Sequence, residues 1–560
     1  MTPLGRSGAA GAIVGLLTGL LALGPGLAGG YLLAYDMVFV PDQPLTAAVL
    51  GTDGSVPRSV PNDLVVVLAS TVLPGDVVQK LLLLAAFVLA GWGVGRLLPT
   101  PLAATAGATT YCWNAYVLER LAIGHWGFLL GLAALPWAVA AAQAVRRGEP
   151  RAVPVLCLVI ALTGLAGSTA LVLVSIMVLV LLAGPGWRDR LPAAGWAAIT
   201  TVGAAAPWLV PALREAGSMR ADPGGVAAFA AAADTPLGVL GSVLTTGGIW
   251  DSAVWPAERA EWLLAGSTLL FVVAAVVAGA GPWRRHAGGA GSATLAVGAL
   301  GLLLALAGAT PGLDAAVRVL VVHVPGGGLV RDGQKFLALA LVPLAVCAGM
   351  ATQRAASRMG PGAWLLPLLP VAVLPSLAWG LHGRLEPVQY PAAWMALRDE
   401  VDRATAEHPG AVASFPFTYY RRYAWNGDRV VLDPLPRFLD VEVLVNDDLP
   451  LTGQVVGGED RRAARVRAAL AGTGDLAAVL AREGVGHVVV QRDQPDAGGQ
   501  GQRLAGLPTV WQRGGLALLR VSGPVRPGPD RSLPVGVAIG GLTLLAAGGA
   551  VLLPRLRPRC

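Results

Sequence analysis

The stretch GGYLLAYDMVFVPDQP runs from Gly29 to Pro44 and follows a long apolar segment without a charge, which begins near Gly8. About twenty apolar residues cross the hydrocarbon core of a bilayer, so we predict that the chain spans a membrane here. The segment has no clear small-residue cleavage site before Tyr31, which favours a retained span over a signal peptide. Asp36 and Asp42 are therefore expected at the boundary where the chain emerges from the membrane.

The composition extends this prediction to the whole chain. Its 560 residues are 54% hydrophobic and 13% charged, with a mean hydropathy of +0.62, whereas soluble domains carry about 25% charged residues. We therefore predict a polytopic α-helical membrane protein. The net charge of +7 does not indicate a nucleic-acid partner, because the arginines lie in short clusters between apolar segments, as membrane orientation requires.

Apolar segments long enough to approach a bilayer thickness recur along the chain. We place twelve transmembrane helices at residues 9–33, 77–98, 101–118, 124–145, 152–168, 169–186, 192–213, 262–281, 291–310, 335–353, 363–382 and 533–554. With the N-terminus in the cytoplasm, every inner turn is then basic and nearly all acids outside the large domain face outward. This distribution predicts a multi-pass protein of the cytoplasmic (inner) membrane with both termini in the cytoplasm.

Residues 384–531 differ from the rest, because charged and turn-forming residues become frequent and no segment could span a bilayer. The stretch VLAREGVGHVVVQRD (Val479 to Asp493) indicates a helix, a glycine turn and a short strand. We therefore expect an extracytoplasmic α/β domain over 384–531. It would follow a membrane domain over 1–383, with outer loops at 34–76, 214–261 and 311–334, and precede a final helix and basic cytoplasmic tail over 532–560.

Ionisable residues gather where the predicted topology reaches the outer boundary. An ionisable group at membrane depth costs on the order of 2.5–3.5 kcal/mol and is by default a functional candidate. NAYVLERLAIGHW begins at Asn114 and GGGLVRDGQK begins at Gly326. With the first loop and the start of the second span, these segments supply Asp36, Asp42, Lys80, Glu119, Arg120, His125, Trp126, Arg331, Asp332 and Lys335.

Acids beside Arg, Lys and His next to the acyl region suit a lipid that carries a phosphate. Arginine and lysine bind phosphate and stabilise the charge of a phosphate leaving group. An aspartate near an acceptor hydroxyl could remove its proton during attack on a sugar carbon.

This layout resembles the GT-C superfamily of integral membrane glycosyltransferases, which use polyprenyl-phosphate-linked sugars on the outer face. YDMVFVPDQP corresponds to the first outer loop, where the family has its catalytic acid, and Asp36 is the match. ERLAIGHWGFLLGLAALPW and GGGLVRDGQKF resemble segments of actinobacterial and archaeal members. Many members carry two adjacent acids in this loop, whereas Asp36 and Asp42 are separated by five residues that include Pro41.

The resemblance implies transfer of a sugar of mannose or arabinose type, with inversion, to a cell-envelope glycan or glycolipid. Asp36, with Asp42 as a second candidate, would be the catalytic base, although turn chemistry also explains Asp42. Arg120, His125, Arg331, Lys335 and Lys80 would hold the donor phosphate, supported by Glu119, Asp332 and Trp126. Local ion pairing, or snorkelling for the two lysines, are the competing explanations.

The stretch YYRRYAWNGDRVVLDPLPRF (Tyr419 to Phe438) is dense in aromatic and basic residues. Tyr420, Arg421 and Trp425 are candidates for acceptor binding, against a folded edge with cation–π pairs. No metal-ligand spacing is recognisable, although the outer acids leave a divalent cation open. Two alternatives to a transferase remain: a transporter, flippase or scaffold for a lipid-linked glycan, and a transferase fold that has lost its chemistry.

Overall fold

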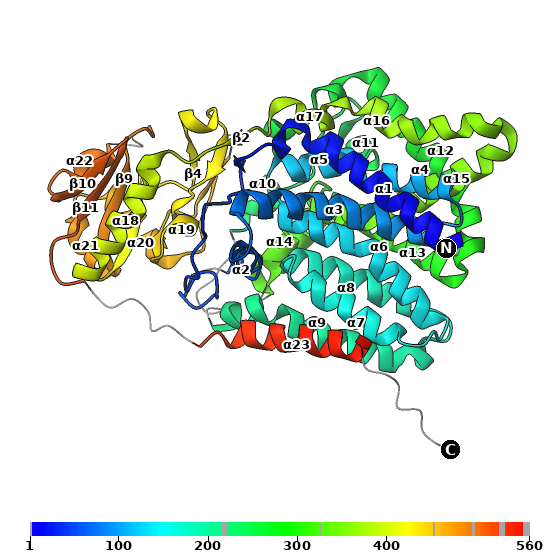
Figure 1. The fold of residues 1–560 in the computed structure, drawn as a ribbon, viewed down its shortest axis with the longest axis horizontal. Coiled ribbons are helices and arrows are strands. Elements are labelled where there is room, and N and C mark those ends of the chain that lie inside the picture. The colour runs from blue at the N-terminus through cyan, green and yellow to red at the C-terminus, as the bar shows by residue number, and fades with distance from the viewer. Residues whose placement is uncertain are drawn as a thin grey trace, which may run out of the picture.

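The computed structural model describes residues 3–55, 57–214, 222–324, 326–451, 454–495, 499–525 and 533–552. The predicted basic tail at 555–560 lies outside these residues, as do residues 215–221 of the predicted second outer loop. Figure 1 shows a helical body with the α/β part of the chain at one end, and the N-terminus lies at the opposite end of that body.

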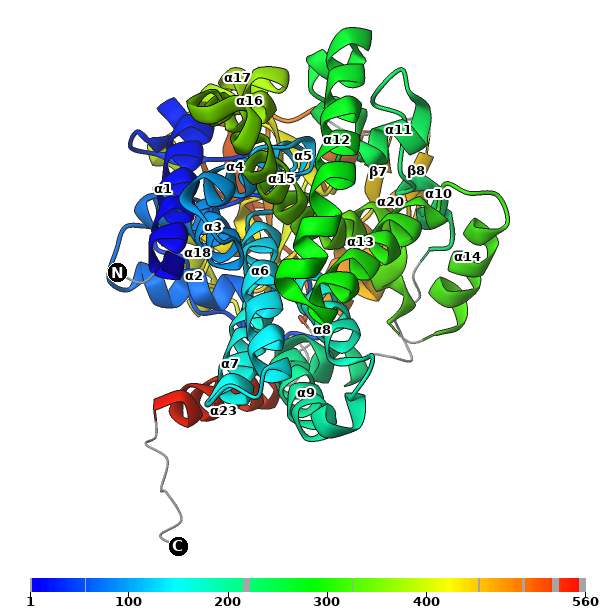
Figure 2. The same cartoon turned by 90° about the vertical axis from the view of Figure 1, so that its right-hand side faces the viewer.

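The helical body is a bundle of apolar helices joined mostly by short turns. Its main helices are α1 (Pro3–Leu23), α3 (Gly75–Leu97), α4 (Pro101–Cys112), α5 (Ala115–Ala122), α6 (Trp126–Arg146), α7 (Ala152–Gly164), α8 (Ser168–Leu182), α9 (Leu191–Arg214), α12 (Trp262–Ala287), α13 (Gly289–Ala307), α15 (Ala338–Met359) and α23 (Val535–Leu552). Figure 2 shows the last helix, α23, beside α7 and α9. The protein is thus a polytopic helical membrane protein, as the sequence predicts.

The described residues contain eight helices that are long and apolar enough to cross a membrane, with two shorter apolar helices, α7 and α8. The number of twelve spans therefore stays a prediction. Two predicted spans are discontinuous, each for a local reason.

The predicted span 101–118 is divided between α4 and α5 by Asn114. Its amide nitrogen donates to the carbonyls of Thr110 and Tyr111 at the end of α4, at 3.0 and 2.9 Å. Its side-chain oxygen accepts from the backbone N–H of Val117 at 3.0 Å and caps α5. One side chain thus ends one helix and begins the next, which turns α5 away from the course of α4.

The predicted span 363–382 is not one helix either. It is divided into a 3₁₀ helix at Gly360–Leu368, α16 (Leu369–Val373), a short 3₁₀ turn at Pro375–Leu377 and α17 (Ala378–Gly383). Prolines recur through this segment, and each removes a backbone donor and clashes with the preceding turn. The sequence shows that this segment is apolar, but the prediction of one continuous helix over it is wrong.

Glycines allow α1 and α3 to pack with their backbones in contact. A Cβ atom added at Gly11 would lie 2.1 Å from the carbonyl oxygen of Gly91, and one added at Gly15 would lie 2.3 Å from that of Phe87. Small residues at a four-residue spacing are the usual means of such close approach between membrane helices. This packing fixes the direction in which the chain leaves α1 and enters the Asp36 loop.

The α/β part is built on a five-stranded mixed sheet with the order β10–β11–β9–β3–β6. Its strands are β3 (Ala411–Phe415), β6 (Val443–Leu444), β9 (Val485–Gln491), β10 (Thr509–Arg513) and β11 (Leu516–Arg520). β3 runs parallel to β6 and β9, and β11 is antiparallel to β9 and β10. Helices α18 (Ala392–Glu407), α20 (Arg461–Ala471), α21 (Leu476–Arg482) and α22 (Gln500–Leu504) accompany the sheet.

The predicted helix–glycine–strand element at 479–493 is present as α21, a turn at Gly484 with a φ of +80°, and β9. A conformation with positive φ favours glycine, which explains the residue at this turn.

The α/β part is joined to the membrane part through the first loop. β1 (Tyr31–Leu32) pairs with β2 (Pro387–Val388) in an antiparallel ladder. Tyr35 forms an isolated bridge with Val431 in β5 (Val430–Leu432), which pairs in turn with β4 (Tyr420–Arg422). The two parts share one hydrophobic core, in which Leu23 and Trp394 are both buried. The loop that carries Asp36 is therefore held from both sides.

Candidate active site at the Asp36 loop

Asp36 lies in the loop after α1, and its backbone is fixed by the turn between α5 and α6. Its N–H donates to the carbonyl of Ile123 at 3.2 Å. Gly124 has a φ of +80°, and a Cβ atom there would lie 2.3 Å from the backbone nitrogen of Met37 and 2.4 Å from the carbonyl oxygen of Ala34. The loop can lie this close to the turn because residue 124 has no side chain.

The carboxylate of Asp36 has a different partner on each oxygen. Oδ1 accepts from the hydroxyl of Tyr420 at 3.0 Å, and Oδ2 lies 3.4 Å from Nε2 of His125. The Asp36 side chain nevertheless remains 40% exposed. An ionised carboxylate has about four lone-pair directions, so a further hydroxyl group can still reach it.

Behind His125 lies Arg120, whose side chain is completely buried. Its Nη1 is 3.3 Å from Nδ1 of His125 and 3.3 Å from Oδ2 of Asp332. Its Nη2 donates to the side-chain oxygen of Gln334, and its guanidinium lies 5.2 Å from the ring centre of Tyr116. Arg120 therefore joins the α5–α6 turn to the segment that precedes α15.

That segment is the predicted RDGQK stretch, and it brings a second cation to the site. Nζ of Lys335 lies 3.5 Å from Oδ2 of Asp332. The backbone carbonyl of Lys335 accepts from the hydroxyl of Tyr116 at 2.7 Å. The Lys335 side chain keeps 24% of its surface exposed. Segments about two hundred residues apart thus meet beside Asp36.

A buried polar layer lies beneath these residues. Nε2 of Gln334 donates to Oε2 of Glu119 at 3.1 Å, and Glu119 also interacts with Asp234. Asp234 is paired with Arg259 at 2.5 and 2.9 Å. All four side chains are buried, so this layer supports the site and offers no surface for a ligand.

The pKa values of Asp36 and His125 are both lower than the usual values for these side chains. Burial raises the pKa of Asp36, but hydrogen bonds from His125 and Tyr420, with the charge of Lys335, hold it below its usual value. Burial lowers the pKa of His125, assisted by the charges of Lys335 and Arg120 and opposed by Asp36. At neutral pH the site therefore contains an ionised carboxylate and a neutral imidazole.

Exposure separates the cations that can meet a ligand from those that cannot. Lys335 and Arg331 are partly exposed, as is Arg58 from the first outer loop. Arg331 pairs with Glu459 at 3.2 Å and covers the ring of Phe229 at 5.1 Å. Arg120 is buried and His125 is mostly buried, with its Nε2 towards Asp36, so the phosphate contact expected for these two residues stays a prediction.

Two residues of the predicted site lie elsewhere. Lys80 donates to the carbonyls of Ala28 and Gly30, the latter at 2.8 Å, and pairs with Asp76 at 3.4 Å. These contacts hold the backbone that follows α1 and leads into the Asp36 loop, and they do not support a phosphate role for Lys80. Asp42 is exposed, and its charge acts on Tyr31 and Arg398 rather than on the Asp36 cluster.

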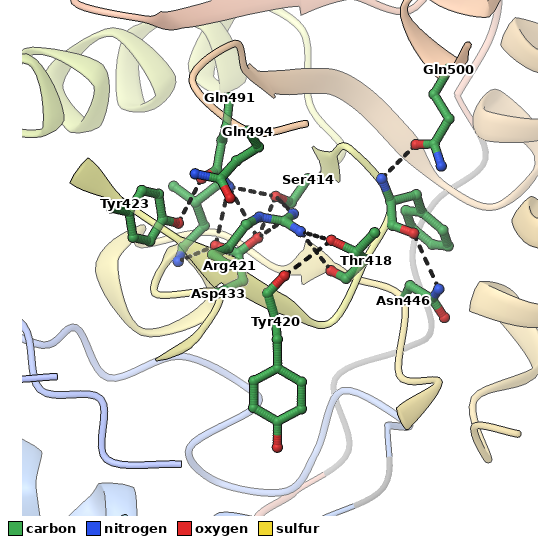
Figure 3. Close-up of polar contacts among 12 residues, drawn as sticks. Ser414, Thr418, Tyr420, Arg421, Tyr423, Asp433, Asn446, Gln491, Gln494 and Gln500 are labelled. Atoms are coloured by element: carbon green, nitrogen blue, oxygen red, sulfur yellow. Dashed lines mark hydrogen bonds and ion pairs between the residues drawn. The ribbon is translucent and has the colours of Figure 1, made fainter. Parts of the chain in front are cut away.

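Of the three candidate residues in the α/β part, one contacts the Asp36 site and two do not. Arg421 is buried and pairs with Asp433 at 2.9 Å, within the polar cluster drawn in Figure 3. Trp425 packs against Tyr423 with ring centres 4.9 Å apart. Arg421 and Trp425 thus contact other residues of the α/β part, whereas Tyr420 reaches Asp36, and acceptor binding by these three residues stays a prediction. Trp126 is nearly buried and packs against Phe39 at 5.1 Å, which supports the Asp36 loop.

Sequence reasoning did not select Arg58, which lies over the ring of Tyr419 and pairs with Asp447 at 3.3 Å. The signal was available, because an arginine in a predicted outer loop runs against the inside bias of basic residues. Gln334 lies in the GGGLVRDGQK segment of the predicted boundary, but its uncharged side chain gives no such signal and no role is predicted for it. Within the part of the chain that the structure describes, no group of three or more His, Cys, Asp or Glu side chains is placed to hold a metal ion.

Comparison with known proteins gives a match at the level of the fold. No family model and no curated protein matches the chain. The solved structure of the arabinofuranosyltransferase AftD from mycobacteria matches with a TM-score of 0.59 at 18% identity, over 93% of this chain and 40% of that one. A structure of an AftD mutant gives the same TM-score at 17% identity, over 93% of this chain and 42% of that one.

The chain thus spans about two fifths of the AftD chain. At this identity the match concerns the fold, and it agrees with the resemblance stated from the first outer loop. The chain shares the fold of the matched part of the AftD structure.

Proposed function

We propose that this chain is a membrane glycosyltransferase that transfers a sugar from a polyprenyl-phosphate donor to a cell-envelope glycan or glycolipid. The observation that carries the proposal is the accessible carboxylate of Asp36, which is ionised and lies beside the partly exposed cation Lys335, in a chain that folds like AftD. A carrier of lipid-linked glycans would use the cations, but it has no need of a positioned base.

The proposed step is a direct displacement at the anomeric carbon. The acceptor oxygen forms a bond to that carbon while its proton passes to Asp36. The bond between the carbon and the phosphate oxygen breaks, and polyprenyl phosphate leaves with the electron pair. Lys335 and Arg331, which are partly exposed, would stabilise the charge on the leaving phosphate. Attack opposite to the leaving group inverts the anomeric centre.

The donor sugar is proposed to be arabinofuranose. Of the two expected sugar types, mannose and arabinose, the activity named for AftD supports the second. We further propose that residues 1–383 bind the donor, that 384–531 contribute to the acceptor side outside the cytoplasmic membrane, and that both termini face the cytoplasm.

The test is a transfer assay with the purified chain in proteoliposomes. Radiolabelled polyprenyl-phosphate arabinose and, separately, polyprenyl-phosphate mannose would be offered with envelope arabinan and mannan glycolipids. The proposal predicts label in the acceptor from the arabinose donor. Retained binding of both donors without transfer to any acceptor would favour a carrier of lipid-linked glycans instead.

A further inference from the structure

The side chain of Tyr420 connects the α/β part of the molecule to the membrane part. It is the first residue of β4, and its hydroxyl donates to Oδ1 of Asp36 at 3.0 Å across 384 residues of sequence. Alternate residues of a strand point to opposite faces. Arg421 accordingly enters the polar cluster around Asp433, while the Tyr420 ring extends away from that cluster in Figure 3.

The hairpin that carries Tyr420 also holds the backbone next to Asp36. The N–H of Tyr35 donates to the carbonyl of Val430 at 2.6 Å, and the N–H of Leu432 donates to the carbonyl of Tyr35 at 2.9 Å. The rings of Tyr35 and Tyr420 meet edge to face at 6.1 Å. β5 therefore fixes the residue before the carboxylate, and β4 fixes the carboxylate itself.

The Tyr420 hydroxyl acts here only as a donor. Burial, followed by the charge of Asp36, raises the pKa of Tyr420 well above its ordinary value, so its proton is retained at physiological pH. The charged or titratable groups that act on Asp36 are His125, Tyr420, Lys335 and Arg437. Of these, Tyr420 is the group that binds Oδ1, while His125 faces Oδ2.

We propose that Tyr420 is a positioning residue for Asp36, so that the α/β part completes the catalytic site as well as facing the acceptor. Tyr420 and His125 contact different oxygens of the carboxylate, and the Asp36 side chain stays partly exposed. This inference rests on the proposed function, since it assigns Tyr420 to the base of that reaction.

The experiment compares Tyr420→Phe with Tyr419→Phe. Tyr419 is the adjacent residue, and its hydroxyl accepts from Arg58 rather than binding Asp36. Loss of a hydrogen bond to a charged acceptor favours its protonated form. In Tyr420→Phe we expect the acid limb of kcat/KM to move up by about one pH unit, which is a tenfold change in the protonation constant. Tyr419→Phe should keep the wild-type profile.

A second measurement is independent of turnover. The infrared band of the protonated Asp36 carboxyl, identified by its absence in Asp36→Asn, would be titrated in wild type and in both tyrosine variants. An upward shift in Tyr420→Phe alone supports the contact. If that shift occurs and no donor yields transfer, the proposed function fails while the contact between the two residues stands. Identical titrations and identical pH profiles in the two tyrosine variants would overturn the inference.

Discussion

Arg120 donates from Nη1 to Nδ1 of His125 across 3.3 Å, and this contact sets the tautomer of the imidazole. A guanidinium has no acceptor, so Nδ1 must accept and the ring proton of neutral His125 must lie on Nε2. That nitrogen faces Oδ2 of Asp36 at 3.4 Å. The buried Arg120 therefore places the Nε2–H donor of His125 towards Asp36, the proposed base.

A neutral His125 predicts how the site responds to pH. Its pKa is lowered in the fold by burial, below the usual value of about 6.5. The unfolded chain therefore takes up this proton first, and the imidazole reduces stability as pH falls below about 6.5. The depressed pKa of Asp36 gives stability above about 3.9 that is lost as pH falls through the folded value.

Transfer activity is consequently expected to show no His125 inflection at the ordinary imidazole pKa of about 6.5, and to fall only in more acidic solution. The measurement is the dependence of kcat/KM on pH. An inflection near 6.5 that disappears in His125→Gln would show that the imidazole titrates at its ordinary pKa, contrary to this expectation.

Removing the buried guanidinium should destabilise the protein. Arg120→Gln leaves Asp332 without its buried partner, and loss of one member of such a pair costs about 3–5 kcal/mol. Arg331 pairs with Glu459 in a partly exposed position, where a pair is worth about 0–1 kcal/mol. Thermal unfolding in detergent should give a clearly lower midpoint for Arg120→Gln and a nearly unchanged one for Arg331→Gln. Equal midpoints would contradict the structural role of Arg120.

The two lysines of the chain should behave oppositely towards a phosphate ligand. Lys335 is partly exposed beside Asp36, whereas Lys80 is engaged by backbone carbonyls and Asp76. Lys335→Gln should weaken binding of polyprenyl phosphate about tenfold, as expected for one charge-assisted contact. Lys80→Gln should lower the unfolding temperature without changing that affinity. Binding of the lipid to the protein in nanodiscs measures the affinity, and a loss confined to Lys80→Gln would reverse the assignment.

Gly124 offers a test of the loop that requires no change at an ionisable residue. Gly124→Ala places a Cβ atom 2.3 Å from the backbone of Met37 and should displace the Asp36 loop. Gly148 has a φ of +65° with nothing within 4 Å, so Gly148→Ala carries the same type of backbone strain without the collision. We expect about a hundredfold loss of transfer in the first variant and little in the second, in line with the cost of a small displacement of a catalytic group. Similar rates in both would mean that the loop tolerates the displacement.

The fold and part of the site could be predicted because the membrane simplifies the problem. Apolar length fixes the depth of each helix, and basic turns fix its direction. Asp36, His125 and Lys335 each adjoin the same predicted boundary, and they do meet in the structure. However, the depth of a residue in the membrane does not determine which side of the helix bundle it lies on. Lys80 lies at the predicted boundary, but its ammonium group donates to backbone carbonyls of the segment that follows α1.

The remaining features depend on contacts between distant parts of the chain. The sequence around Arg120 does not indicate its burial, because Asp332 and Gln334 lie 212 and 214 residues away. The partner of Asp36 in the α/β part is likewise 384 residues distant. The local sequence also does not show which of Tyr420 and Arg421 points towards the membrane part, because this depends on the register of β4 against β5.

The most direct test of the central claim compares Asp36→Asn with Asp42→Asn. Both acids lie in the loop after α1, both substitutions remove one charge with little change of shape, and only Asp36 contacts Tyr420 and His125. In single-turnover transfer from the arabinose donor, Asp36→Asn should lose at least about a hundredfold in rate, the usual contribution of a general base. Asp42→Asn should retain the wild-type rate, and both should bind donor normally. Undiminished turnover by Asp36→Asn would contradict the assignment of Asp36 as the base.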